Sequence, residues 1–180
     1  VMHGSIARVF NDCADDRETD VVILTGAGKA FSAGGDYKAM QLSIDNPGRF
    51  DRLAVEAKRI VFSMLDCPKP IIAKVNGHAI GFGATLALFS DIVFAASHAR
   101  IGDPHVLVGY VAGDGGAAIW PQLIGYAKAK EFLFTGGLLT AVEAEKIGLI
   151  NHVLPAGELD TAVQAFAERL LGEVWKRMTA

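Results

Sequence analysis

Residues 71–83 read IIAKVNGHAIGFG. The first five residues are apolar apart from one lysine, a short run typical of a buried strand in a parallel sheet. Asn76-Gly77 ends the run, and the segment 81–83 opens a helix that we expect to continue through Phe89. A buried strand that alternates with a helix along the chain is the pattern of an α/β domain.

The same pattern recurs on both sides of this stretch. The apolar run 21–24 predicts another buried strand, and a loop of small residues follows it at 28–36, GKAFSAGGD. Residues 92–95 and 151–154 predict two further strands. Helices are expected around these strands: one near residues 6–13, one from the cap Asn46-Pro47 to before Pro68, one in the apolar segment 117–124, one from the capping box at Thr140 and Glu143 to Gly148, and one carrying Leu159, Val163, Phe166 and Leu170.

Length and composition agree with one ordinary domain. The chain has 180 residues, half of them apolar, and its net charge of −3 predicts no nucleic-acid or membrane partner. We place the core at residues 1–171 and assign no role to 172–180. Cys13 and Cys67 form neither a disulfide framework nor a metal-ligand pattern, which favours a cytoplasmic protein. Because the sequence begins at Val1 in a helical pattern, we expect the natural N-terminal strand to be missing.

The two glycine-rich loops suggest a specific chemistry. A thioester carbonyl that gains negative charge needs two N–H donors, and backbone amides in such loops provide them without a bulky side chain. The alternative is that Gly34-Gly35 and residues 81–83 only satisfy turn geometry or close packing. A P-loop at residues 26–29 is excluded, because Ala30 follows Lys29 where that motif requires Ser or Thr.

Five ordered segments resemble the crotonase (enoyl-CoA hydratase/isomerase) family. They are residues 28–36 and 76–83, which match the family's two oxyanion loops, followed by 90–96, 134–136 and 144–151. The resemblance covers the chain to about Leu171. It implies an α/β fold made of a spiral of ββα turns with helices packed outside, with the N-terminal strand and part of the C-terminal helical region incomplete. It also implies assembly as a homotrimer or hexamer.

The resemblance also implies the site. The two amides that would hold the acyl carbonyl fall on Gly35 and Phe82, and the Phe82 side chain would narrow the acyl pocket. Further contacts to the substrate are expected from positions that match the same loops: Ala33, Asp36, Gly81 and Thr85. The substrate would be an acyl-CoA thioester, so coenzyme A enters as part of the substrate. We expect no separate cofactor and no metal.

The acid–base residues depart from the family pattern. Hydratases of this family hold a water between two glutamates, and the matching positions carry Thr85 and His105. A threonine hydroxyl is far too weakly acidic to act as a base near neutral pH, whereas histidine has an ordinary pKa of about 6.5. Standard two-glutamate hydration is therefore not expected, and His105 is the predicted acid/base.

Asp114 follows His105 by nine residues. A carboxylate that accepts from one imidazole nitrogen fixes the tautomer, so the other nitrogen can take a proton. The His105…Gly113-Asp114-Gly115 stretch is similar to the β-diketone (carbon–carbon bond) hydrolases of the same superfamily. On residue preference alone, Asp114 is equally suited to capping a helix. The alternative for His105 is a half-buried histidine that only packs, although its match to a family catalytic position favours a functional role.

Three functions therefore stay open. The first is an enoyl-CoA hydratase- or isomerase-like enzyme that stabilises an enolate and uses His105 oriented by Asp114. The second is a carbon–carbon hydrolase of a β-diketone with the same two residues. The third is a protein that binds acyl-CoA without chemistry, which the threonine at position 85 favours.

Overall fold

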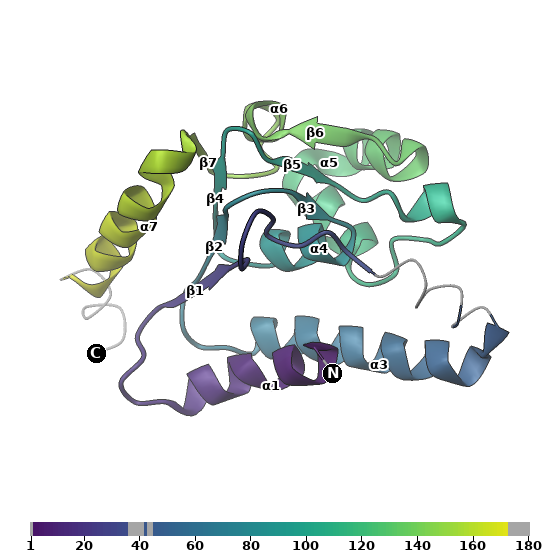
Figure 1. The fold of residues 1–180 in the computed structure, drawn as a ribbon, viewed down its shortest axis with the longest axis horizontal. Helices are drawn as coiled ribbons and strands as arrows, with labels where there is room; N and C mark the ends of the chain where they lie inside the picture. The colour runs from purple at the N-terminus through teal and green to yellow at the C-terminus, as the bar shows by residue number, and fades with distance from the viewer. Residues whose placement is uncertain (1, 36–41, 43–44, 173–180) are drawn as a thin grey trace.

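Four parallel strands form the larger sheet of the computed structural model, which describes residues 2–35, 42 and 45–172 (Figure 1). They are β1 (Val22–Thr25), β2 (Ile71–Val75), β4 (Ile92–Ala96) and β7 (His152–Leu154), in the order β1-β2-β4-β7. Ile72 pairs with Ile92 at the centre, where β2 is buried almost throughout. Continuous apolar runs suit these central strands because both faces of the sheet are covered.

A smaller sheet carries the loops that matter for function. It consists of β3 (Ala79–Ile80), β5 (Arg100–Gly102) and β6 (Leu138–Thr140), with β3 parallel to β5 and β5 antiparallel to β6. Ser32 adds a parallel bridge to Ala79, so the loop after β1 lies beside β3. The chain thus passes from the larger sheet to the smaller one after each of β1, β2 and β4.

Helices complete each turn of this path. β2 and β3 lead into α4 (Phe82–Leu88), and β4 and β5 lead through the short 3₁₀ helix η1 (His105–Val108) into α5 (Gly116–Thr135). The succession of one strand in each sheet and then a helix is a ββα spiral, as the sequence predicted. α6 (Ala141–Lys146) then connects β6 to β7.

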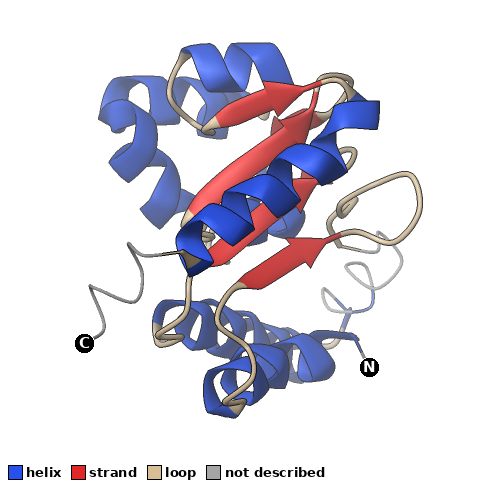
Figure 2. Cartoon of the chain, turned by 90° about the vertical axis from the view of Figure 1, so that its left-hand side faces the viewer, coloured by secondary structure: helices blue, strands red, loops and turns tan. Residues whose placement is uncertain are grey.

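The remaining helices cover the outside. α1 (Met2–Asp15) packs along α3 (Pro47–Leu65) at the bottom of Figure 1, and α7 (Ala156–Leu171) lies in front of the strands of the larger sheet in Figure 2. The main core, which includes Phe10, Val75 and Trp120, lies between the sheets and α1, α3, α4 and α5. A second cluster around Ile72 and Phe94 lies beneath α7.

Several local predictions are confirmed. Pro47 begins α3 behind the cap Asn46, and Thr140 and Glu143 form the expected capping box of α6. The helix after the second glycine loop ends at Leu88, with Phe89 as its C-cap. In the described part of the chain, no helix is long and apolar enough to cross a membrane.

The first strand differs from its prediction. β1 spans residues 22–25 and alternates between half-buried and exposed positions, and Ile23 is 38% exposed. β1 lies at the edge of the larger sheet, so one side of it lacks the neighbour that covers β2 and β4. Local patterns did not indicate where β3, β5 and β6 lie, because two or three residues are too few to show a period. Asp36 and the segment 173–180 lie outside the described residues.

Candidate active site

The two glycine-rich loops meet at the ends of adjacent segments of the smaller sheet. The Ser32 amide donates to the His78 carbonyl at 3.0 Å, and the Ile80 amide donates to the Ser32 carbonyl at 2.9 Å. A side chain at Gly34 would collide with the Ile80 carbonyl, because a Cβ there would lie 2.8 Å from that oxygen. The close contact of the loops explains why residue 34 is glycine, and it brings Gly35 and Phe82 into the same region.

The second loop is also bonded to β5, the strand that Asp103 and His105 follow. The Gly81 amide donates to the Gly102 carbonyl at 2.9 Å, so the end of β3 is joined to the end of β5. Gly81 has φ = +57°, a conformation that favours glycine. Functional groups gather where parallel strands end, which here places 32–35, 81–82 and 103–105 side by side.

His105 begins η1, two residues after Asp103, and its ring lies against the second glycine loop. A Cβ on Gly81 would lie 3.4 Å from Cε1 and 3.6 Å from Nε2 of the imidazole. The His105 side chain is 14% exposed, so it is mostly buried but reachable. The edge of the ring that carries Cε1 and Nε2 therefore faces the second glycine loop.

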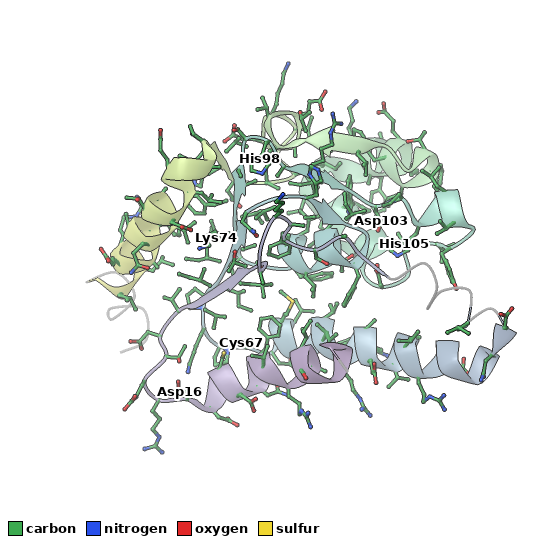
Figure 3. All side chains as sticks on the ribbon, in the orientation of Figure 1. Asp16, Cys67, Lys74, His98, Asp103 and His105 are labelled. Atoms are coloured by element: carbon green, nitrogen blue, oxygen red, sulfur yellow. The ribbon has the colours of Figure 1, made fainter. Side chains whose placement is uncertain are left out.

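Asp103 contacts the opposite nitrogen of the ring. The Asp103 Oδ1 atom forms a hydrogen bond with His105 Nδ1 and also accepts the His105 backbone amide at 3.3 Å. Asp103 is 2% exposed, and its Oδ2 atom has no hydrogen-bond partner. Figure 3 shows the two labelled side chains next to each other. Sequence reasoning missed Asp103, although the order Asp103-Pro104-His105 placed a carboxylate within reach of the histidine.

Asp114 approaches the Nε2 side. Its Oδ2 atom lies 3.5 Å from His105 Nε2, and its Oδ1 atom accepts the Thr85 hydroxyl at 3.2 Å. The cap of α5 is Gly115 rather than Asp114, and no side chain caps this helix; the Gly116 amide lies 3.5 Å from Asp114 Oδ1. Only this long contact therefore supports the alternative that Asp114 caps the helix.

The protonation equilibria reflect these contacts. The hydrogen bond from Asp103 raises the pKa of His105 above its ordinary value; burial opposes this shift, and the charge of Asp114 adds to it. Burial raises the pKa of Asp114, and the positive charge of protonated His105 opposes that shift. His105 therefore keeps its proton to a higher pH than a free imidazole.

The predicted substrate contacts that the structure describes lie in the same region. Thr85 is fully buried on α4, and Gly81 is buried against His105. Ala33 and Gly35 are exposed on the first loop, and Phe82, the first residue of α4, is half-buried. Asp36 lies outside the described residues.

Asp103, His105 and Asp114 each offer a possible metal-ligand atom, and these atoms lie within 4.8 Å of one another. One histidine gives one nitrogen to an ion, and each nitrogen of His105 already faces a carboxylate. An ion held by all three side chains would have to break one of these contacts. The geometry fits an acid–base cluster better than a metal centre.

Comparison with known proteins decides the family. The family model described as enoyl-CoA hydratase/isomerase matches residues 2–178. The chain belongs to the enoyl-CoA hydratase/isomerase family. The crystal structure of an enoyl-CoA hydratase from Bacillus anthracis superposes with a TM-score of 0.88 at 31% identity, covering 94% of this chain and 66% of that one. The crotonase fold implied by the resemblance of the five segments is therefore confirmed.

Curated members of the enoyl-CoA hydratase/isomerase family give the same result. The chain is 40% identical over 168 residues to a probable mitochondrial enoyl-CoA hydratase of Dictyostelium discoideum, covering 93% of this chain and 58% of that protein. It is 40% identical over 161 residues to the crotonyl-CoA hydratase of Syntrophomonas wolfei, covering 88% of this chain and 61% of that protein. The chain thus spans about three fifths of these relatives.

Proposed function

We propose that this chain carries out proton transfer on an acyl-CoA thioester, as an enoyl-CoA hydratase- or isomerase-like enzyme. The backbone amides of Gly35 and Phe82 would stabilise the enolate oxygen, and His105 would exchange a proton with the substrate or a water. The names of the relatives support the substrate class. The observation that carries the proposal is the imidazole of His105 against Gly81, with Nε2 facing the second glycine loop.

The chemistry needs one base and one stabilised oxyanion. Removing a proton from the carbon next to a thioester carbonyl leaves negative charge on the oxygen, which two amides can stabilise. Returning the proton at another carbon gives isomerisation, and adding water across the double bond gives hydration. A positioned acid–base group contributes about 10²–10⁴-fold in rate.

The test is turnover of crotonyl-CoA and longer enoyl-CoAs, followed by ultraviolet absorbance of the conjugated thioester. We expect turnover by the wild-type protein and a large loss in His105→Ala. If no thioester is turned over and none binds, the proposal is wrong. Tight binding of coenzyme A thioesters without turnover across the panel would favour a binding protein instead.

A second candidate rests on a separate observation. Asp114 Oδ2 lies 3.5 Å from His105 Nε2, so both groups can contact one water molecule. We propose as the alternative that such water attacks a ketone of a β-diketone and an enolate leaves. Release of acid from a cyclic diketone, lost in both His105→Ala and Asp114→Asn, would support this reaction. Full activity in both variants would exclude it.

A further inference from the structure

Two carboxylates flank His105, and they contact different ring nitrogens. Asp103 bonds to Nδ1, whereas Asp114 lies 3.5 Å from Nε2, beyond the usual range of about 2.7–3.2 Å for N–H···O bonds. Asp114 already accepts the Thr85 hydroxyl through its other oxygen. The two aspartates therefore differ in what they can do to the imidazole.

The backbone at Asp103 is held in place by the smaller sheet. It follows β5 directly, and the preceding Gly102 carbonyl accepts the Gly81 amide at 2.9 Å. The Oδ1 atom receives both the backbone amide and the ring Nδ1 of His105. A carboxylate accepts but does not donate when ionised, so a nitrogen bonded to it must carry the proton.

The other oxygen of Asp103 shows how closely this carboxylate is enclosed. Oδ2 is buried without a hydrogen-bond partner, and a Cβ added at Gly116 would lie 2.3 Å from it. Only a glycine at the start of α5 leaves room for the carboxylate. An ionised oxygen in such surroundings costs free energy, which the interaction with the imidazole offsets.

We infer that Asp103 is the positioning residue of this site: it holds the proton of neutral His105 on Nδ1 and leaves the Nε2 lone pair facing the second glycine loop. Asp114 then acts at the working nitrogen, where it can share a substrate or water oxygen with Nε2. This division of roles replaces the sequence-based expectation that Asp114 orients His105. The tautomer follows from contacts alone, and only its effect on turnover rests on the proposed function.

The direct test is ¹⁵N NMR of the histidine-labelled chain without ligand, from pH 5 to 10, with the His105 signals assigned by their loss in His105→Gln. We expect the neutral wild-type ring to be protonated on Nδ1. In Asp103→Asn the uncharged amide no longer enforces this choice. The Nε2-protonated form should then become the major species, and the titration midpoint should fall. Asp103 and Asp114 are the charged groups acting on His105 among the described residues.

Two more variants separate positioning from folding. Gly116→Ala keeps every titratable group but displaces the Asp103 carboxylate, so it should shift the tautomer in the same direction. Asp91→Asn removes a carboxylate that accepts the Ile71 amide at 2.7 Å on the larger sheet, and it should leave the His105 signals unchanged. If Asp103→Asn, or Gly116→Ala should the former not fold, leaves His105 on the wild-type tautomer, the inference is wrong. It is equally wrong if Asp114→Asn alone reverses the tautomer.

The kinetic consequence is tested separately. With crotonyl-CoA, Asp103→Asn should lower kcat by about 10²-fold or more with little change in KM, because the base presents the wrong nitrogen. If His105→Ala turns over the thioester like the wild type, the proposed function fails while the NMR result on Asp103 still stands. If the tautomer reverses and kcat does not change, the effect of Asp103 on turnover is refuted.

Discussion

Thr85 donates its hydroxyl to Asp114 across 29 positions of sequence, with 3.2 Å between Oγ1 and Oδ1. Thr85 is fully buried on α4, and Asp114 lies in the turn before α5. Thr85, whose hydroxyl cannot act as a base, therefore positions Asp114, whose carboxylate can accept a proton. This contact leaves the second oxygen of Asp114 facing His105 Nε2 at 3.5 Å.

Replacing Thr85 by valine tests this contact. Valine keeps the shape of the side chain but loses the donor, so Asp114 Oδ1 keeps only the long contact with the Gly116 amide. Losing a hydrogen bond to a mostly buried carboxylate costs about 1–3 kcal/mol. We expect Thr85→Val to unfold at lower urea concentration and to turn over crotonyl-CoA more slowly than the wild type. Thr85→Ser keeps a hydroxyl, so it should retain most of the wild-type stability and turnover rate. Equal stability and rate in the valine and wild-type proteins would show that the hydroxyl does not matter.

His105→Ala should lower kcat/KM by about 10²–10⁴-fold, the usual contribution of a general acid–base group. Binding of a coenzyme A thioester, measured by calorimetry, should be retained because the glycine loops are unchanged. His98→Ala is the matched control: His98 is exposed, and its loss should leave the rate as it is. A similar loss in both variants would point to damage to the fold rather than to chemistry.

Phe82→Pro tests the second amide donor. Proline is well tolerated at the first position of a helix, which Phe82 occupies in α4, but it has no N–H. Losing one oxyanion donor typically costs about 10²–10³ in kcat. Phe82→Ala keeps the amide and widens the pocket, so it should retain turnover and accept longer acyl chains. Retention of the wild-type rate in the proline variant, with circular dichroism confirming the fold, would remove this amide from the mechanism.

The raised pKa of His105 also predicts how stability depends on pH. The folded state binds this proton more tightly than the unfolded chain, where the pKa is about 6.5. The resulting stabilisation is fully present below about pH 6.5 and is lost as the pH rises through the folded-state pKa. The free energy of unfolding of the wild type, relative to His105→Gln, should therefore fall from pH 6 to pH 9 in urea titrations. A constant difference would mean that the pKa of His105 is not raised.

The elements with strong local signals could be predicted from the sequence. The apolar runs gave β2 and β4, and the pairs Asn46-Pro47 and Thr140-Glu143 gave the starts of α3 and α6. These features act within a few residues, so they can be recognised in the sequence. The short strands β3, β5 and β6 cannot be recognised in this way, because their pairing depends on distant partners. Five ordered segments, the two glycine loops among them, also indicated the family, which the comparisons confirm.

The sequence by itself determined the α/β class through local patterns and the family through five ordered segments. It also placed His105, Asp114 and the two glycine loops as candidates, because these follow motif positions. Only the tertiary structure decided which carboxylate meets which nitrogen. Asp103 is only two residues from His105, but the ring turns Nδ1 toward it while its other edge lies against Gly81. Asp114 approaches Nε2 with one oxygen and accepts the Thr85 hydroxyl with the other. Contacts with distant segments orient the ring and Asp114, and spacing along a chain does not encode the direction in which a side chain points.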